Sequence, residues 1–167
     1  MVKYLKKAEP RSRQDNRQIS ERVRAMLDDI EQNSDDAVRR YARELDRWES
    51  PEFRVSAGDI DAARRSASTV FKEDFTVCKR QVTDFAKRQR DSMHEFEAEI
   101  GDGITLGQKI IPVETVGCYV PGGKYPLISA AIMSIATAKV AGVPHVIGAA
   151  PPRDARGIYP LTLYALA

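Results

Sequence analysis

The uneven distribution of charge is the sequence feature that most constrains how this chain folds. Residues 1–100 hold 21 of the 26 lysines and arginines and 21 of the 24 aspartates and glutamates. Helices with so many charges bury one stripe each and solvate the rest, whereas a segment with few charges is typical of strands and helices buried on both sides. We therefore expect a helical region over residues 1–100 and an α/β region over residues 101–167, with the change falling between residues 100 and 114.

Length and composition limit the class of protein further. The chain has 167 residues, enough for one domain or one domain with an arm, and its composition of 43% hydrophobic and 30% charged residues excludes a disordered or collagen-like chain. A net charge of +2 gives no field that favours nucleic acid or an acidic membrane as partner. The uncharged stretch 125–138 is shorter than the ~20 residues of a membrane span. Two cysteines and no signal-peptide pattern favour a cytoplasmic protein.

Apolar residues recur at helical spacing along residues 1–100. The first two stripes are Ile19, Val23, Met26, Leu27 and Ile30, then Val38, Tyr41, Leu45 and Trp48 after a predicted N-cap at Ser34. Ser56 is predicted to cap a shorter helix. A longer helix carries a narrow seam of Phe71, Phe75, Cys78, Val82 and Phe85, in steps of four and three residues. We favour packing of this seam within its own domain, and a dimer contact is the alternative.

The second region has the pattern of a parallel, doubly wound sheet. Residues 116–120 and 143–149 read as buried strands, with a buried helix over 127–140 between them and another helix from Ile158. Pro126 is predicted in the first turn of the helix over 127–140, and Gly142 at the end of that helix. Ligands bind such sheets at the carboxyl ends of the strands, here residues 119–124 and the turn after Ala149. Because two strands do not complete such a sheet, we expect the chain to be the front part of a longer protein.

Two known phosphate-binding motifs do not fit the turn after the first strand. Counting back from Lys124 puts Cys118 where a P-loop has its first glycine, and Tyr125 replaces the hydroxyl residue. Gly117, Gly122 and Gly123 also have the wrong spacing for the dinucleotide fingerprint GxGxxG. A tight turn without a ligand therefore remains an alternative for this segment.

Longer stretches of the chain carry a family resemblance. The run PVETVGCYVPGGKYPL at residues 112–127, continued by MSIATAKVAGV at 133–143 and Pro151-Pro152, resembles the NAD-binding domain of the histidinol dehydrogenase family. DDIEQNSDDAVRRYA at 28–42 and VSAGDIDAA at 55–63 resemble the N-terminal helices of that family. Within the family, GCYVPGGKYP is more similar to the sulfopropanediol dehydrogenase branch than to the enzymes of histidine synthesis.

The resemblance implies a Rossmann-like NAD-binding domain and an NAD- and zinc-dependent homodimeric enzyme. Such an enzyme oxidises a primary alcohol, of the histidinol or sulfopropanediol type, through an aldehyde to a carboxylate. The family's dinucleotide-contacting tyrosine corresponds to Tyr119, with Pro121, Gly122 and Gly123 shaping the loop around it. The zinc ligands and the acid/base pair of the family lie beyond the matched part, so no catalytic or metal-binding residue is assigned in this chain.

Other candidate residues do not supply the missing chemistry. His94, in a predicted helical tail, and His145, at a strand start, each lack a second ligand at zinc-site spacing. Cys118 has no histidine or aspartate partner that would make it a nucleophile, and a buried strand position is expected instead. Two functions follow. The chain is either the N-terminal part of the dehydrogenase, inactive alone, or a non-catalytic truncated module for binding or dimerisation, and we favour the first.

Overall fold

The chain forms two compact units. The computed structural model describes residues 13–50, 52–122 and 125–167, with side chains from Arg17 onward. The N-terminal unit covers Met1–Glu49 and the C-terminal unit Ser50–Ala167. The long helix with the aromatic seam therefore shares a unit with the parallel strands, because it packs against the helix that joins them.

From residue 13 onward, the N-terminal unit contains one interrupted helix. Helix α1 (Arg13–Asp46) has a non-helical residue at Ser34, with φ 48° and ψ −132°, which divides it into two segments as the sequence predicted. The prediction that each segment buries a whole stripe is wrong. Ala37 is fully buried, but Ile19, Val23 and Leu27 remain about half exposed or more, because the described part of this unit offers them no second surface.

Two capped helices open the C-terminal unit. The Ser56 hydroxyl accepts a hydrogen bond from the Asp59 amide (3.1 Å) at the start of α2 (Ala57–Ser66), as predicted. Ser68 caps α3 (Thr69–Asp91) in the same way through the Phe71 amide (3.2 Å). Both caps satisfy amide groups that a helix start leaves without partners.

An antiparallel ribbon follows α3. Strand β1 (Phe96–Gly101) pairs with β2 (Ile104–Gln108), with Ala98 opposite Leu106 and Glu99 opposite Thr105. The prediction of helix up to residue 100 is therefore wrong for its last residues, and His94 lies between α3 and β1 rather than in a helical tail. Alternation of apolar and acidic residues from Glu95 to Ile100 has the period of a strand, and the high charge of the segment masked it.

A parallel β-α-β unit forms the centre of the C-terminal unit. Strands β3 (Thr115–Tyr119) and β4 (His145–Ala149) are parallel, which confirms the prediction for these two strands. The helix between them consists of α4 (Ile128–Ala131), a π-helical turn η1 (Ile132–Ala136) and α5 (Thr137–Val140). It starts after Pro126 rather than including it. Gly142 ends it with a positive φ of 89°, as predicted, and α6 (Pro160–Leu166) follows β4.

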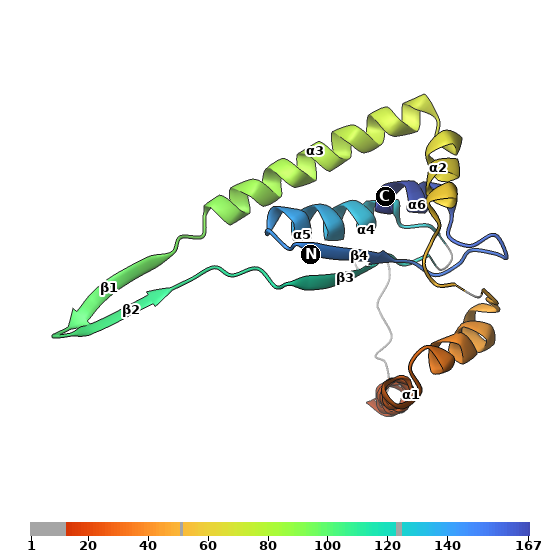
Figure 1. The fold of residues 1–167 in the computed structure, drawn as a ribbon, viewed down its shortest axis with the longest axis horizontal. Coiled ribbons are helices and arrows are strands. Elements are labelled where there is room, and N and C mark those ends of the chain that lie inside the picture. Colours follow the sequence, from red (N-terminus) through yellow and green to blue (C-terminus); the bar gives the residue numbers. More distant parts are fainter. Residues whose placement is uncertain (1–12, 51, 123–124) are drawn as a thin grey trace, which may run out of the picture. The chain divides into compact units, whose positions relative to one another are not determined.

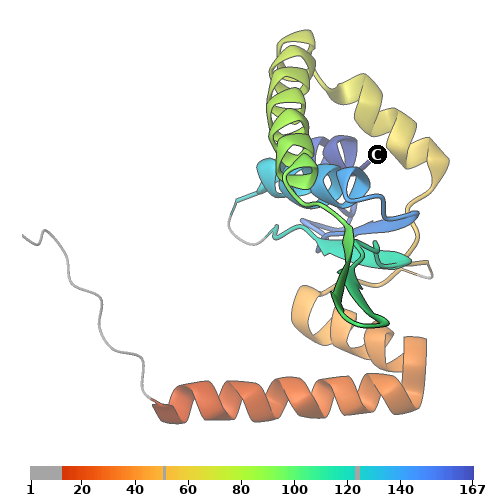
Figure 2. The same cartoon turned by 90° about the vertical axis from the view of Figure 1, so that its left-hand side faces the viewer.

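Helices cover one face of this small sheet. In Figures 1 and 2, the helix over residues 128–140 and α6 lie on the sheet, and α3 and α2 form an outer layer on those helices. Cys118 and Val120 point into the core with Ala131 and Ile132. Alternate residues face the other way, and Tyr119 (65% exposed) and Ile147 (60%) remain open. Burial on both faces, as the sequence predicted, is thus wrong for the described residues.

The aromatic seam of α3 packs in part, since Phe71, Phe75 and Val82 are partly buried. The rings of Phe71 and Phe75 meet Tyr164 of α6 edge-on, with centroids 5.5 and 5.3 Å apart. Cys78 and Phe85 are exposed instead, because the face of α3 that meets the inner helix layer is turned towards Ala86. Among the described helices none is long and apolar enough to cross a membrane.

Candidate functional site

The turn after β3 is held by backbone hydrogen bonds to its surroundings. The Val120 amide donates to the Ala149 carbonyl (2.7 Å), which extends the parallel pairing by one residue. The Leu127 amide donates to the Pro121 carbonyl (3.3 Å), which ties the turn to the start of α4. Tyr119 is therefore fixed at the carboxyl edge of the sheet, with its side chain on the open face.

Gly122 is the point where the turns after the two strands touch. A Cβ atom at this position would lie 2.9 Å from Cγ of Pro151 and 3.4 Å from its Cδ. Only a residue without a side chain fits this approach. Tyr119, Pro121 and Gly122 thus lie where the sequence predicted them, and Gly123 lies outside the described residues. The role of Pro151 was missed, because its sequence signal was only that of a strand breaker.

The helix that starts beside this turn has Leu127 at its N-cap. Among the described residues, no side-chain hydrogen bond caps α4 there. The positive end of the helix dipole favours negative charge at such a position. The open face around Tyr119 and this helix start are thus chemically suited to an aromatic or polar ligand that carries negative charge.

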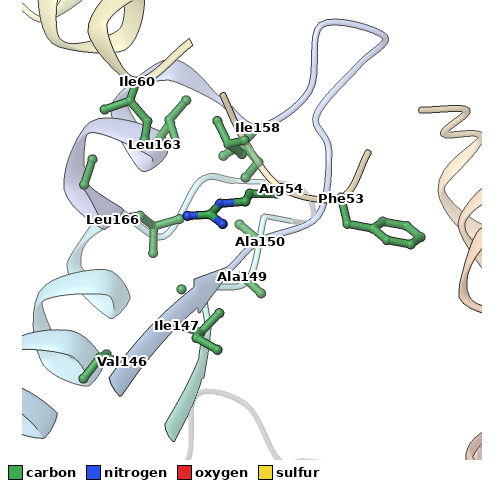
Figure 3. A pocket seen from close by; sticks show the side chains of 13 residues that line it. Phe53, Arg54, Ile60, Val146, Ile147, Ala149, Ala150, Ile158, Leu163 and Leu166 are labelled. Carbon is green, nitrogen blue, oxygen red and sulfur yellow. The ribbon is translucent and has the colours of Figure 1, made fainter. Parts of the chain in front are cut away.

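A second feature is an apolar pocket of about 890 Å³ along the side of β4 (Figure 3). It is lined by residues 146–150, by Ile158, Leu163, Leu166 and Ala167, and by residues 53–55 and Ile60. Arg54, the one charged side chain among the described residues that line it, points towards Leu166. The sequence indicated only a short extended piece there. Tyr119, Pro121 and Gly122 do not line this pocket, but Ala150, in the turn after Ala149, does, so the pocket adjoins one part of the predicted ligand position.

The described residues contain no group of three histidine, cysteine, aspartate or glutamate side chains placed to hold a metal ion. His145 begins β4 and is exposed, and Cys118 is a buried strand residue, as the sequence predicted. Both residues lie within strands and not in the turn after β3.

Comparison with known proteins identifies the family. A model of the histidinol dehydrogenase family matches residues 9–167. The chain belongs to the histidinol dehydrogenase family. This confirms the resemblance found in the sequence.

The relatives of this chain within the histidinol dehydrogenase family carry more than one enzyme name. A sulfopropanediol 3-dehydrogenase from Ruegeria pomeroyi is 40% identical over 98% of this chain and 38% of its own length. A histidinol dehydrogenase homolog from Shouchella clausii is also 40% identical, over 91% of this chain and 36% of its own length. The chain therefore spans little more than a third of the length of these relatives.

The fold agrees with a solved structure of the family. A crystal structure of histidinol dehydrogenase from Elizabethkingia anophelis matches with a TM-score of 0.80 and 25% identity, over 98% of this chain and 35% of that chain. The helices, the ribbon and the β-α-β unit described above thus correspond to about one third of a histidinol dehydrogenase.

Proposed function

We propose that this chain is the N-terminal part of an NAD- and zinc-dependent dehydrogenase that oxidises a small primary alcohol, of the histidinol or sulfopropanediol type, through the aldehyde to the carboxylate. Membership of the dehydrogenase family supports the reaction class. The names of the relatives support both alcohols, since one relative is a sulfopropanediol 3-dehydrogenase and others are histidinol dehydrogenases. A homodimer in the cytoplasm is part of this proposal.

The observation that carries the proposal is the position of Tyr119. It is an exposed aromatic side chain at the carboxyl edge of a parallel strand pair, where open α/β sheets bind ligands. Its role is to contact the dinucleotide. Pro121 and Gly122 orient the loop, because the close approach of Gly122 to Pro151 fixes where Tyr119 lies. The uncapped start of α4 favours the charged part of the cofactor.

NAD, when bound, supplies the hydride acceptor, and zinc in the complete enzyme orients the alcohol. The described residues do not fit a zinc site, since no ligand cluster exists among them. No step at the metal is therefore assigned to these residues. What they do is bind the cofactor and orient it on the open face of the sheet.

The test is a titration of the purified chain with NAD by isothermal calorimetry, after circular dichroism shows that it is folded. We expect saturable binding, and a loss of about tenfold or more in affinity for Tyr119→Ala, because an aromatic contact of this size contributes about 1–2 kcal/mol. Tyr125→Ala is the matched control, since Tyr125 is also exposed and lies six residues along the same loop.

Two results would count against the role of Tyr119. Unchanged NAD affinity in Tyr119→Ala removes the residue from the site. An equal loss in Tyr125→Ala shows a general aromatic surface rather than a specific contact.

A second candidate function, a non-catalytic dimerisation module, is favoured by one observation. The ribbon of β1 and β2 is exposed along its whole length, including Phe96, Ile104 and Leu106. Two strands alone are marginally stable in water, so such a ribbon gains from a partner surface.

A further inference from the structure

Four cationic side chains surround a hollow between α3 and α5. The hollow has a volume of about 400 Å³ and is lined by Lys79, Thr83, Lys87, Arg90 and Asp91 of α3 and by Ala136, Lys139 and Val140 of the inner helix. We call it the basic groove. Both helices belong to the C-terminal unit and pack directly on one another.

The α3 residues of the basic groove form one face of the helix. Lys79, Thr83 and Lys87 are spaced by four residues, so they lie one above the other, and Arg90 follows one turn later. Lys87 and Arg90 are like charges three residues apart, a spacing at which repulsion destabilises a helix by roughly a few tenths of a kcal/mol. Lys139 adds a fourth positive charge from the opposite wall. Packing alone gives no reason for such a concentration of positive charge.

The carboxylates near the basic groove neutralise it only in part. Lys87 lies 4.0 Å from Asp84, and Arg90 lies 3.8 Å from Asp91; both pairs are more than half exposed. Exposed pairs at such distances contribute little. Within residues 13–50, 52–122 and 125–167, Lys79 and Lys139 have no carboxylate within 4.0 Å. Two full positive charges therefore face the groove without a counterion from the described chain.

Stabilisation of a helix C-terminus accounts for one of the cations. The Arg90 Nη1 group donates to the Val140 carbonyl (3.0 Å), where α5 ends, and a cation is favourable at that position. Lys79 lies about three turns before Arg90 on α3 and Lys87 about one turn before it, and neither shares this hydrogen bond. The cations other than Arg90 need another explanation.

We propose that the basic groove binds a small multivalent anion of the phosphate class, such as a pyrophosphate or a phosphorylated metabolite. Lysine ammonium groups act as point charges for phosphate oxygens, and the Thr83 hydroxyl is a neutral donor beside them. The volume suits a small ligand, and Ala136 and Val140 form an apolar floor beside these donors.

The basic groove is separate from the turn that carries Tyr119. It lies at the carboxyl end of the helix over residues 128–140, whereas the turn leads into the amino end of that helix. The helix connects the end of β3 with the start of β4, so its two ends lie at opposite edges of the sheet (Figure 1). The groove and the turn therefore share no residue and lie at opposite ends of this helix.

The experiment is a calorimetric titration of the full chain with sodium pyrophosphate at constant ionic strength. We expect saturable 1:1 binding that weakens about tenfold in Lys79→Ala and again in Lys139→Ala, because each removes one charge-assisted contact of about 1.4 kcal/mol. Lys109→Ala is the matched control, an exposed lysine between β2 and β3, and its affinity should change less than twofold. Tyr119→Ala should leave pyrophosphate binding unchanged.

The outcomes separate this proposal from the proposed NAD site. Loss of pyrophosphate binding with intact NAD binding in the two groove variants supports the basic groove. A folded chain that shows no saturable pyrophosphate binding, or an equal loss in Lys109→Ala, overturns it. If Tyr119→Ala loses pyrophosphate binding while Lys79→Ala and Lys139→Ala keep it, the anion binds at the dinucleotide turn, and the proposal is also overturned.

Discussion

Gly122 shows how one residue couples the two turns of the candidate site. Its backbone allows Pro151 to approach within a distance that any side chain would obstruct. We predict that Gly122→Ala lowers the free energy of unfolding by about 1–3 kcal/mol, the usual effect of an added methyl in a filled space. It should also weaken NAD binding, because the turn that carries Tyr119 must shift. Thermal unfolding followed by circular dichroism, with a parallel NAD titration, measures both effects.

Gly117 is the matched control for this change. It lies in β3, the strand that leads into the turn with Gly122, and a Cβ atom there meets nothing within 4 Å. Gly117→Ala should leave stability unchanged or raise it by about 0.5–1 kcal/mol, because alanine loses less backbone entropy on folding. Equal destabilisation by the two substitutions would show that the contact with Pro151 is not the reason.

The sequence predicts those features of the candidate site that depend on a single turn. A strand followed by Pro121 and Gly122 is enough to place Tyr119 at a sheet edge. The contact with Pro151 and the entry of Arg54 into the pocket depend on segments far apart in the chain. No local pattern encodes such contacts, so neither could be derived from one sequence.

The kink of α1 is stabilised by a carboxylate that joins its two segments. Asp29 accepts hydrogen bonds from Asn33 (2.8 Å), Arg40 (2.5 Å) and the Tyr41 hydroxyl (2.5 Å). The hydrogen bonds from Tyr41, Arg40 and Asn33 lower the pKa of Asp29 to about 2. The same interaction raises the pKa of Tyr41, because its phenol donates to the carboxylate.

We predict a pH dependence for this cluster with a defined sign. The pKa of Asp29 is lower in the folded state, so its stabilisation is complete above about pH 4 and is lost as the pH falls towards about 2. Asp29→Asn should lower the thermal midpoint at pH 6 and flatten its dependence on pH between 4 and 2. Asp28→Asn is the control and should keep the wild-type dependence. Identical pH profiles for the two variants would contradict the prediction.

Helices and strands were predicted correctly where a segment shows a single local sequence pattern. The break of α1 at Ser34, the Ser56 cap and the parallel pair of β3 and β4 all follow from local patterns. The β1–β2 ribbon was missed in part because its first strand lies in the charge-rich region, where helical spacing was the expectation. Charge content thus indicates how exposed a segment is, but it does not distinguish a helix from a strand.

On the scale of the molecule, the described chain has more apolar surface than its own elements cover. One face of the β3–β4 sheet is open, and Phe85 of α3 is 64% exposed. A parallel sheet is normally covered on both faces. The chain spans little more than a third of its relatives' length, so covering surfaces from elsewhere in a longer protein or from a second copy are consistent with the proposed function.

The ribbon offers the sharpest test of association between copies. Paired residues share a face, so Phe96, Ala98 and Leu106 lie on an apolar side, while Glu97, Glu99 and Thr105 lie on a polar side. Burial of the apolar side contributes about 25 cal/mol per Å², which favours a dimer. We predict that the chain self-associates in sedimentation velocity and that Leu106→Lys shifts it to monomer. Thr105→Lys adds the same charge on the polar side and should sediment like the wild type. Equal behaviour of both variants, or a monomeric wild type, would show that this face is not the surface through which copies associate.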